Sequence, residues 1–394
     1  MKYNFDEIAS RRNTYSLKWD VKENELPMWV ADMDFICPHF IKEAIEKRMN
    51  IRAYGYSNIP DSFFDSIISW WKSNHDIEFK KEDMIYSSGI VAAISSMVRK
   101  LTCVGENVLL QSPTYNIFYN SIYNNGRNII SNDLVYENGK YHIDFMDLEE
   151  KLSNPQTTLM ILCNPHNPIG KIWSKEELRK IGELCNKYNV TVISDEIHCD
   201  IVDPDKNYVP FASVNEVNKE ISITCIASSK TFNLAGLQSA CLVVSNEILH
   251  HKVWRGLNTD EVAEPNFFSM EANIAAFTKG YEYVKELREY IYQNKMLVRD
   301  FIKKELPLLH LVPSEATYLL WIDVSKYHTD SVTLVKYIKE KTGLILSDGL
   351  EYGENGRYFV RMNVGTSKSV VLDGLNRLKI ALNTIGEKEN YEEN

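Results

Sequence analysis

The sequence predicts an α/β protein with a largely parallel sheet, followed by a smaller α+β domain. Two observations support this prediction. Between about residues 85 and 245, short β-rich apolar runs alternate with amphipathic helical segments, the pattern of βα units around a parallel sheet. After about residue 268 the texture changes, because a long charged helical stretch leads into isolated strand-like runs.

Four apolar runs in the first part are the clearest candidate strands of the parallel sheet. They are Asn107–Gln111, Thr158–Cys163, Val190–Ser194 and Ser222–Ala227. Polar residues, Gly or Pro follow each run, at 112–115, 164–168, 195–198 and 228–230. Ligands bind at the carboxyl ends of the strands in open α/β sheets, so we expect the functional site where these four segments meet.

The second part of the chain predicts the smaller domain. A helix is expected over Met270–Glu305, and strands are expected at Tyr318–Ile322 and Tyr358–Met362. The N-terminal run Leu26–Phe35 is too apolar for a solvated tail. We therefore divide the chain into an N-terminal segment that packs on both domains (1–45), a large domain (46–268) and a small C-terminal domain (269–394).

Composition and charge exclude several classes of partner. The net charge is −10, with 44 Lys and Arg against 54 Asp and Glu, so nucleic acid and anionic membranes are not expected. No apolar stretch reaches the roughly 18 residues of a membrane span. Seven widely spaced cysteines indicate reduced thiols in a cytoplasmic protein. The motifs CxxC, HExxH, GxGxxG and GxxxxGK[ST] are missing, and we predict no metal site.

The polar residues after the four candidate strands form a chemically coherent set. Lys230 follows a strand among small hydroxyl residues, where a lysine can act as a Schiff-base nucleophile. Asp195 ends an apolar strand, where an ionised carboxylate needs a cation or strong donors. Asn167 lies in a rigid turn and can donate to a phenolate oxygen, and Tyr115 offers a flat ring for stacking on a heteroaromatic group.

An anion site is predicted at the start of one helix. Tyr86–Ile94 contains a glycine turn that opens a helix, whose free N–H groups and dipole suit an anion. The backbone donors would come from Gly89, Ile90 and Val91.

These residues resemble the fold-type I enzymes that depend on pyridoxal 5′-phosphate (PLP), the superfamily of aspartate aminotransferase, over nearly the whole chain. The resemblance implies a mostly parallel seven-stranded sheet between helices, a smaller α+β domain, PLP as cofactor and a homodimer. It also implies that Lys230 carries the cofactor on its amine and that Asp195 pairs with the pyridine nitrogen. Asn167 would bind the 3′-oxygen and Tyr115 would stack on the ring.

The sequence departs from this family where the phosphate would bind. The family usually has a serine and often a basic residue at the positions of Ala227 and Gln238. Ser228 is the expected substitute for the missing serine. A tyrosine donated across a dimer interface would then matter more, and we expect Tyr56 to supply it, with simple aromatic packing as the alternative.

The resemblance also assigns the substrate site. Arg361 occupies the place of the arginine that binds the substrate carboxylate, and a guanidinium can hold a carboxylate by two parallel hydrogen bonds. Val30 and Ala31 would line the same site. An α-amino acid substrate follows from these expectations.

The reaction is indicated by the residue three positions after Asp195. Aminotransferases of this fold commonly have tyrosine there, whereas this chain has His198, which we place near the cofactor. The chain is similar to the MalY/PatB-type cystathionine β-lyases in 26–35, 54–57, 164–168 and 230–236. This implies α,β-elimination from L-cystathionine, a related S-substituted cysteine or cysteine, giving homocysteine or hydrogen sulfide, pyruvate and ammonia. A PLP aminotransferase and a lyase with an added regulatory protein-binding role stay open as alternatives.

Overall fold

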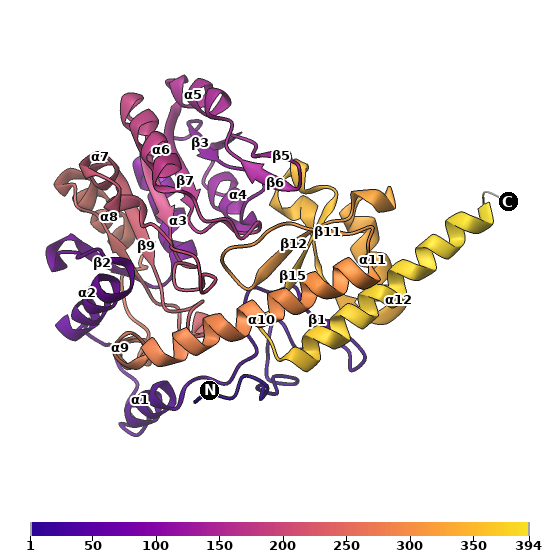
Figure 1. The fold of residues 1–394 in the computed structure, drawn as a ribbon. Coiled ribbons are helices and arrows are strands. Elements are labelled where there is room, and N and C mark those ends of the chain that lie inside the picture. Colours follow the sequence, from indigo (N-terminus) through magenta and orange to yellow (C-terminus); the bar gives the residue numbers. More distant parts are fainter. Residues whose placement is uncertain (1, 393–394) are drawn as a thin grey trace.

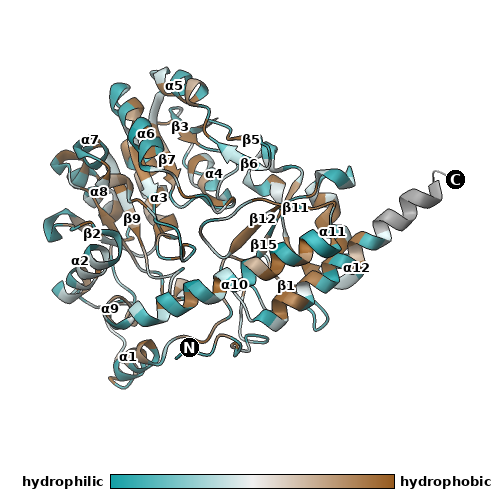
Figure 2. Ribbon diagram, in the orientation of Figure 1, coloured by the Kyte–Doolittle hydropathy of each residue, from teal (hydrophilic) through white to brown (hydrophobic). Residues whose placement is uncertain are grey.

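The computed structural model describes residues 2–392 and consists of a large and a smaller sheet, each covered by helices (Figure 1). Hydrophobic residues concentrate on the strands and on the inward sides of the helices (Figure 2). Within residues 2–392, no helix combines the length and the apolar composition needed to cross a bilayer.

The large sheet has seven strands in the order β2-β10-β9-β8-β7-β3-β4, and only β10 runs antiparallel to its neighbours. The prediction of a mostly parallel seven-stranded sheet is therefore confirmed. The strands are β2 (Met84–Ser87), β3 (Asn107–Leu110), β4 (Asn128–Ser131), β7 (Thr157–Cys163), β8 (Thr191–Asp195), β9 (Ser222–Ile226) and β10 (Ala240–Val243).

Helices cover both faces of this sheet because successive strand residues point to opposite sides. Val108 and Leu110 pack with α3 (Ile90–Leu101), α4 (Asn116–Tyr123) and α8 (Glu247–Thr259). Leu109, between them, packs instead with α5 (Phe145–Ser153) and α6 (Lys175–Lys187). The buried residues of α1 (His39–Met49), α2 (Asp61–His75) and α9 (Ser269–Lys279) form a further core beside β2 and β10. The short helix α7 (Glu216–Glu220) precedes β9.

The smaller sheet is antiparallel, in the order β11-β12-β15-β14. Its strands are β11 (His310–Leu311), β12 (Leu319–Asp323), β14 (Ser347–Asp348) and β15 (Phe359–Asn363). It shares a core with α11 (Ser331–Thr342), α12 (Lys368–Glu392) and the second half of α10 (Tyr281–Glu305). A hairpin of β5 (Val135–Glu137) and β6 (Lys140–His142) lies outside both sheets.

Helix α10 joins the two halves of the molecule along its 25 residues. Tyr283 and Leu287 belong to the core beside the large sheet, whereas Val298 and Ile302 belong to the core of the smaller one. The preceding helix α9 packs mainly with α1 and α2. The change from one core to the other thus occurs inside α10, later than the boundary at 268 that the change in sequence texture suggested.

The N-terminal segment contacts both halves. Its strand β1 (Leu26–Pro27) pairs in parallel with β13 (Leu344–Ile345) from the smaller half. A few residues later, the backbone of Met33 exchanges two hydrogen bonds with the side chain of Asn233, which follows β9 of the large sheet. The segment therefore runs between the two sheets, close to the carboxyl ends of the parallel strands.

Candidate functional site

A cavity of about 530 Å³ lies at the carboxyl ends of the parallel strands. It brings together segments that are far apart in the sequence. Of the residues predicted for the site, nine line it: Ala31, Gly89, Ile90, Val91, Tyr115, Asn167, Asp195, His198 and Lys230. Ala227 and Gln238, the two positions that depart from the family pattern, also line it.

Lys230 is held inside the cavity by the backbone of the N-terminal segment. Its Nζ donates a hydrogen bond to the carbonyl oxygen of Ala31 at 2.6 Å, and the Tyr318 hydroxyl donates to the same oxygen at 3.1 Å. Burial lowers the pKa of Lys230 to about 8, against smaller raising effects of Asp32 and Asp195. Lys230 is thus a partly buried amine with a lowered pKa, which suits a nucleophile and a base.

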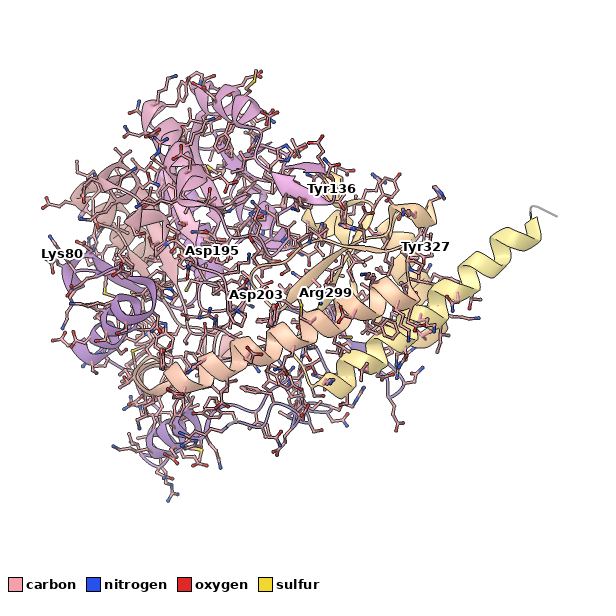
Figure 3. The ribbon with its side chains drawn as sticks, viewed as in Figure 1. Lys80, Tyr136, Asp195, Asp203, Arg299 and Tyr327 are labelled. Carbon is pink, nitrogen blue, oxygen red and sulfur yellow. The ribbon has the colours of Figure 1, made fainter. Side chains whose placement is uncertain are left out.

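Asp195 ends strand β8 inside the molecule (Figure 3). Its side chain is buried, and its Oδ1 accepts a hydrogen bond of 3.3 Å from the Ile197 backbone. Burial raises the pKa of Asp195 to about 7. No cationic side chain that the structure describes forms an ion pair with it, so this carboxylate lacks the positive partner that an ionised buried group needs.

Arg361 reaches the site from β15 of the smaller sheet. Its Nη2 donates to the carbonyl of Trp29 at 2.8 Å, its Nη1 donates to Oδ1 of Asn167 at 3.2 Å, and its guanidinium lies 4.8 Å from the ring centroid of Tyr352. The side chain is only 4% exposed. Within the described part of the chain, no carboxylate pairs with it and its Nε has no partner. A buried guanidinium without an anion is a ready site for a carboxylate ligand.

Asn167 and Tyr115 lie on neighbouring strand ends. Because an arginine can only donate, the bond from Arg361 fixes Oδ1 of Asn167 on that side and turns Nδ2 the other way. The Tyr115 ring packs edge-on against Phe118, with centroids 5.4 Å apart, and burial raises the pKa of its hydroxyl to about 12. Tyr115 therefore presents a neutral, rigid ring to the cavity.

His198 differs from an ordinary core histidine. It is buried in the cavity wall, and its Nδ1 has no hydrogen-bond partner among the groups that the structure describes. Burial, together with the charges of Lys230 and Arg361, lowers the pKa of His198 to about 3. The imidazole is therefore neutral at physiological pH and keeps free hydrogen-bonding capacity.

The predicted anion site lies at the start of helix α3. Gly89 precedes the helix with φ of 141°, and a Cβ atom at this residue would meet no atom within 4 Å. The backbone is therefore open toward the cavity, and the first N–H groups of the helix have no partner within it. Ser88, Ser229 and Ser239 also line the cavity. Sequence reasoning missed these three serines, although the glycine turn and the Ser-Ser pairs could have pointed to two of them.

The structure corrects one expectation about the anion site and one about the substrate site. Ser228 is buried away from the cavity, because its hydroxyl donates to Oδ1 of Asn273 on helix α9 at 2.6 Å; the next residue, Ser229, lines the cavity instead. Tyr56, expected to act across a dimer interface, is 99% exposed and lies outside the cavity of its own chain, so its role stays a prediction. Val30 is not a lining residue either, since its carbonyl is held by the side chain of Asn363.

A buried hydrogen-bond centre supports the loop that carries Lys230. The carboxylate of Asp200 accepts hydrogen bonds from Trp70 at 2.9 Å, from His75 at 2.9 Å and from Thr231 at 2.8 Å. Thr231 directly follows Lys230. Although His75, Cys199 and Asp200 lie close enough to hold a metal ion, these donors already occupy both carboxylate oxygens.

Comparison with known proteins gives a consistent result. The profile of the family "Aminotransferase class I and II" matches residues 22–378. "Cystathionine beta-lyase PatB" of Bacillus subtilis is 40% identical over 386 residues, which are 96% of this chain and 100% of that protein. "Protein MalY" of Escherichia coli is 29% identical, covering 97% and 100%.

A solved structure with the same fold is described as the PLP-bound C-S lyase from Staphylococcus hominis. It superposes with a TM-score of 0.90 at 33% identity, covering 96% of this chain and 99% of that one. The match extends over both sheets and over the N-terminal segment from residue 22 onward. The chain therefore belongs to the aminotransferase class I and II family.

Proposed function

We propose that this protein is a PLP-dependent carbon–sulfur β-lyase. Its substrates would be L-cystathionine, related S-substituted cysteines or cysteine, and its products a thiol, pyruvate and ammonia. One structural observation carries the proposal: Lys230 and Asp195 line one cavity, and the buried Arg361 is hydrogen-bonded to Asn167 in its wall. None of the three pairs with an opposite charge among the side chains that the structure describes. The names of the relatives, a cystathionine β-lyase and a C–S lyase, support the same reaction.

The cavity fits PLP in its charges and its shape. The buried Asp195 lacks a cation, which the protonated pyridine nitrogen of PLP would supply. Lys230 offers the amine for the covalent link, the ring of Tyr115 offers a stacking face, and Nδ2 of Asn167 is free to donate. The phosphate would lie at the open turn of Gly89, on the N-terminus of helix α3.

When bound, PLP supplies an electron sink that stabilises negative charge at the α-carbon of an amino acid. Asp195 keeps that sink effective, because a carboxylate beside the pyridine nitrogen favours its protonated form. The residues of the chain then accept the proton from the α-carbon and orient the substrate.

Lys230 is the proposed base. Its amine, with a pKa lowered to about 8 by burial, takes the proton from the α-carbon, and the Ala31 carbonyl is positioned to hold the resulting ammonium. The bond between the β-carbon and sulfur breaks, and sulfur leaves with the electron pair as a thiolate. Water then releases the remaining three-carbon unit as pyruvate and ammonia.

Arg361 orients the substrate by its carboxylate. Its Nε and the outer edges of Nη1 and Nη2 form a planar donor set, which favours a bidentate contact. The cation–π contact with Tyr352 holds the guanidinium in plane without neutralising it.

His198 is the residue that favours elimination over transamination in this proposal. It is neutral and has free hydrogen-bonding capacity beside Lys230, whereas a phenol at this position is the aminotransferase pattern. The test compares L-cystathionine turnover with and without a 2-oxo acid. A lyase releases pyruvate in both cases, and an aminotransferase depends on the acceptor and converts PLP to its pyridoxamine form without it.

We also propose that the active protein is a homodimer in the cytoplasm. Tyr56, 99% exposed, and Tyr54, 60% exposed, lie on an extended segment that a second copy could cover, and Tyr56 would then complete the partner's phosphate site. The seven cysteines are free thiols, as is typical of a reducing compartment. Mixing inactive Tyr56→Phe and Lys230→Ala chains should restore part of the activity if each site uses residues of both chains. No recovery in a verified mixed dimer would contradict the shared site.

A further inference from the structure

The segment Met28–Met33, which bends at Val30 and Ala31, offers its backbone carbonyls alternately to two sets of donors. The carbonyls of Trp29 and Ala31 accept hydrogen bonds from Arg361 and Lys230, at 2.8 and 2.6 Å. The carbonyls between and beside them, those of Met28, Val30 and Asp32, all accept from a single residue, Asn363. The carbonyls of Val30 and Asp32 flank that of Ala31, and the Asp32 N–H closes a tight turn onto the Val30 carbonyl at 2.9 Å. The directions of these neighbouring carbonyls are therefore linked through planar peptide groups.

Both amide hydrogens of the Asn363 side chain are donated to this segment. Its two amide hydrogens go to the carbonyls of Val30 and Asp32, at 2.5 and 2.6 Å, and its Oδ1 accepts from the Gly365 backbone at 2.7 Å. Its backbone N–H donates to Met28 at 2.9 Å. The side chain is 1% exposed, so these bonds do not compete with water.

We propose that Asn363 is a positioning residue for the reaction, an inference that rests on the proposed function. By fixing the carbonyls of Val30 and Asp32 on one side, it turns the carbonyls of Trp29 and Ala31 toward the site. Asn363 and Arg361 are two residues apart on β15 and share a face of the strand. The register of one strand thus sets both the substrate-binding arginine and the acceptor of the lysine amine.

The role goes beyond holding the fold together. If the amide of Asn363 were lost, the Val30 carbonyl would keep its bond from the Asp32 backbone at 2.9 Å, and the Asp32 carbonyl would keep its bond from Lys18 at 3.2 Å. Neither carbonyl would become an orphan, so the segment can remain in place. The Asn363→Ala variant would lose the precise direction of the Trp29 and Ala31 carbonyls, which face Arg361 and Lys230.

Helix α10 provides a matched control. Asn294, 2% exposed, likewise donates both amide hydrogens to alternate carbonyls, those of Val364 and Thr366, at 3.0 and 2.8 Å. Among the described residues, it forms no hydrogen bond with the Met28–Met33 segment, and it does not line the cavity. The variants Asn363→Ala and Asn294→Ala each remove two amide-to-carbonyl hydrogen bonds from buried surroundings. Only the bonds of Asn363 hold the Met28–Met33 segment.

The experiment measures two properties of the PLP-loaded variants. The first is the Kd of L-alanine, which has the carboxylate and amine of a substrate but no leaving group, from the change in cofactor absorbance. The second is kcat for pyruvate release. Asn363→Ala should raise the Kd at least tenfold and lower kcat at least tenfold, because the carbonyl partners of Arg361 and Lys230 are no longer aimed. Asn294→Ala should change both by less than threefold at a similar loss of melting temperature.

Similar effects in the two variants, or an Asn363→Ala protein with wild-type Kd and kcat, would overturn the proposal. If Asn363→Ala does not fold, Asn363→Ser, whose single hydroxyl cannot span both carbonyls, is tested in the same way. Failure of the proposed function is distinguishable, because a wild-type protein that binds L-alanine but releases no pyruvate contradicts the lyase assignment and leaves the L-alanine comparison intact.

Discussion

Nη1 of Arg361 lies 3.2 Å from Oδ1 of Asn167, so a strand of the smaller sheet and a turn of the large sheet meet inside the site. The two residues are 194 positions apart. This contact settles the orientation of the Asn167 amide and keeps its Nδ2 free, while it leaves the guanidinium without a counter-ion. One hydrogen bond thus joins Asn167, expected to bind the cofactor, to Arg361, expected to bind the substrate.

The first prediction concerns substrate binding by Arg361. Arg361→Lys keeps the positive charge but loses the planar donor fork, so KM for the amino acid should rise about tenfold or more, equivalent to about 1.4 kcal/mol. The cofactor absorbance should be unchanged, because Arg361 is placed at the substrate and not at PLP. Steady-state kinetics with L-cystathionine measure this. An unchanged KM would mean that another group holds the carboxylate.

The second prediction concerns the stability of the cofactor-free protein and follows from the raised pKa of Asp195. With a folded pKa of about 7 and an ordinary value of 3.8, the native state binds more protons than the unfolded state between these pH values. Stability contributed by the protonated group is present below about pH 4 and is lost as the pH rises to 7. The neutral Asp195→Asn variant does not lose this stability as the pH rises, because it has no carboxyl group to ionise.

The advantage of Asp195→Asn over wild type should therefore grow from pH 4 to pH 7 by about 1–4 kcal/mol and then level off. Urea unfolding of both proteins at pH 4.5, 6 and 8 measures it. Adding PLP should reverse the order at pH 8, since only the carboxylate can pair with the pyridine nitrogen. Parallel pH curves for the two proteins would contradict the account of Asp195.

The third prediction concerns the covalent link to PLP. Lys230→Ala should lose the absorbance of lysine-bound PLP, because no other lysine lines the cavity within the described residues. Lys252→Ala, which removes an exposed lysine on helix α8, should keep it and serves as the control. Retained absorbance in Lys230→Ala after removal of free PLP would exclude Lys230 as the attachment site.

The fourth prediction concerns His198. Since burial lowers its pKa to about 3, the imidazole should not titrate between pH 5.5 and 9. His198→Gln keeps a neutral hydrogen-bonding group, so the rate can fall while the pH profile of kcat/KM keeps its shape. A profile that loses one of its limbs in His198→Gln would show that the histidine changes protonation state during the reaction.

Much of the fold could be predicted from local sequence. The runs beginning at Asn107, Thr158 and Ser222 became β3, β7 and β9 to within one or two residues, because buried parallel strands are continuous apolar runs. Strand β10 also lies in an apolar run, Ala240–Val244, but that run does not reveal its direction or its neighbours. It is four residues long and antiparallel, and its place between β2 and β9 is decided by packing.

The parts of the site that escaped prediction depend on contacts that sequence does not encode locally. Ser228 and Ser229 are chemically equal, and only the path of the backbone after β9 decides that Ser229 faces the cavity. Asn363 makes its hydrogen bonds to a segment more than 330 positions away, at Val30. The resemblance to PLP enzymes supplied the roles of Lys230 and Arg361, and it carried no information about what holds them.

The most direct test of the central claim is the stoichiometry of products from L-cystathionine, with purified PLP-loaded protein and no 2-oxo acid. The account predicts many turnovers, with homocysteine, pyruvate and ammonia formed in equal amounts and none from Lys230→Ala. Release of no more than one equivalent of keto acid per site, with turnover only after a 2-oxo acid is added, would contradict it and identify an aminotransferase.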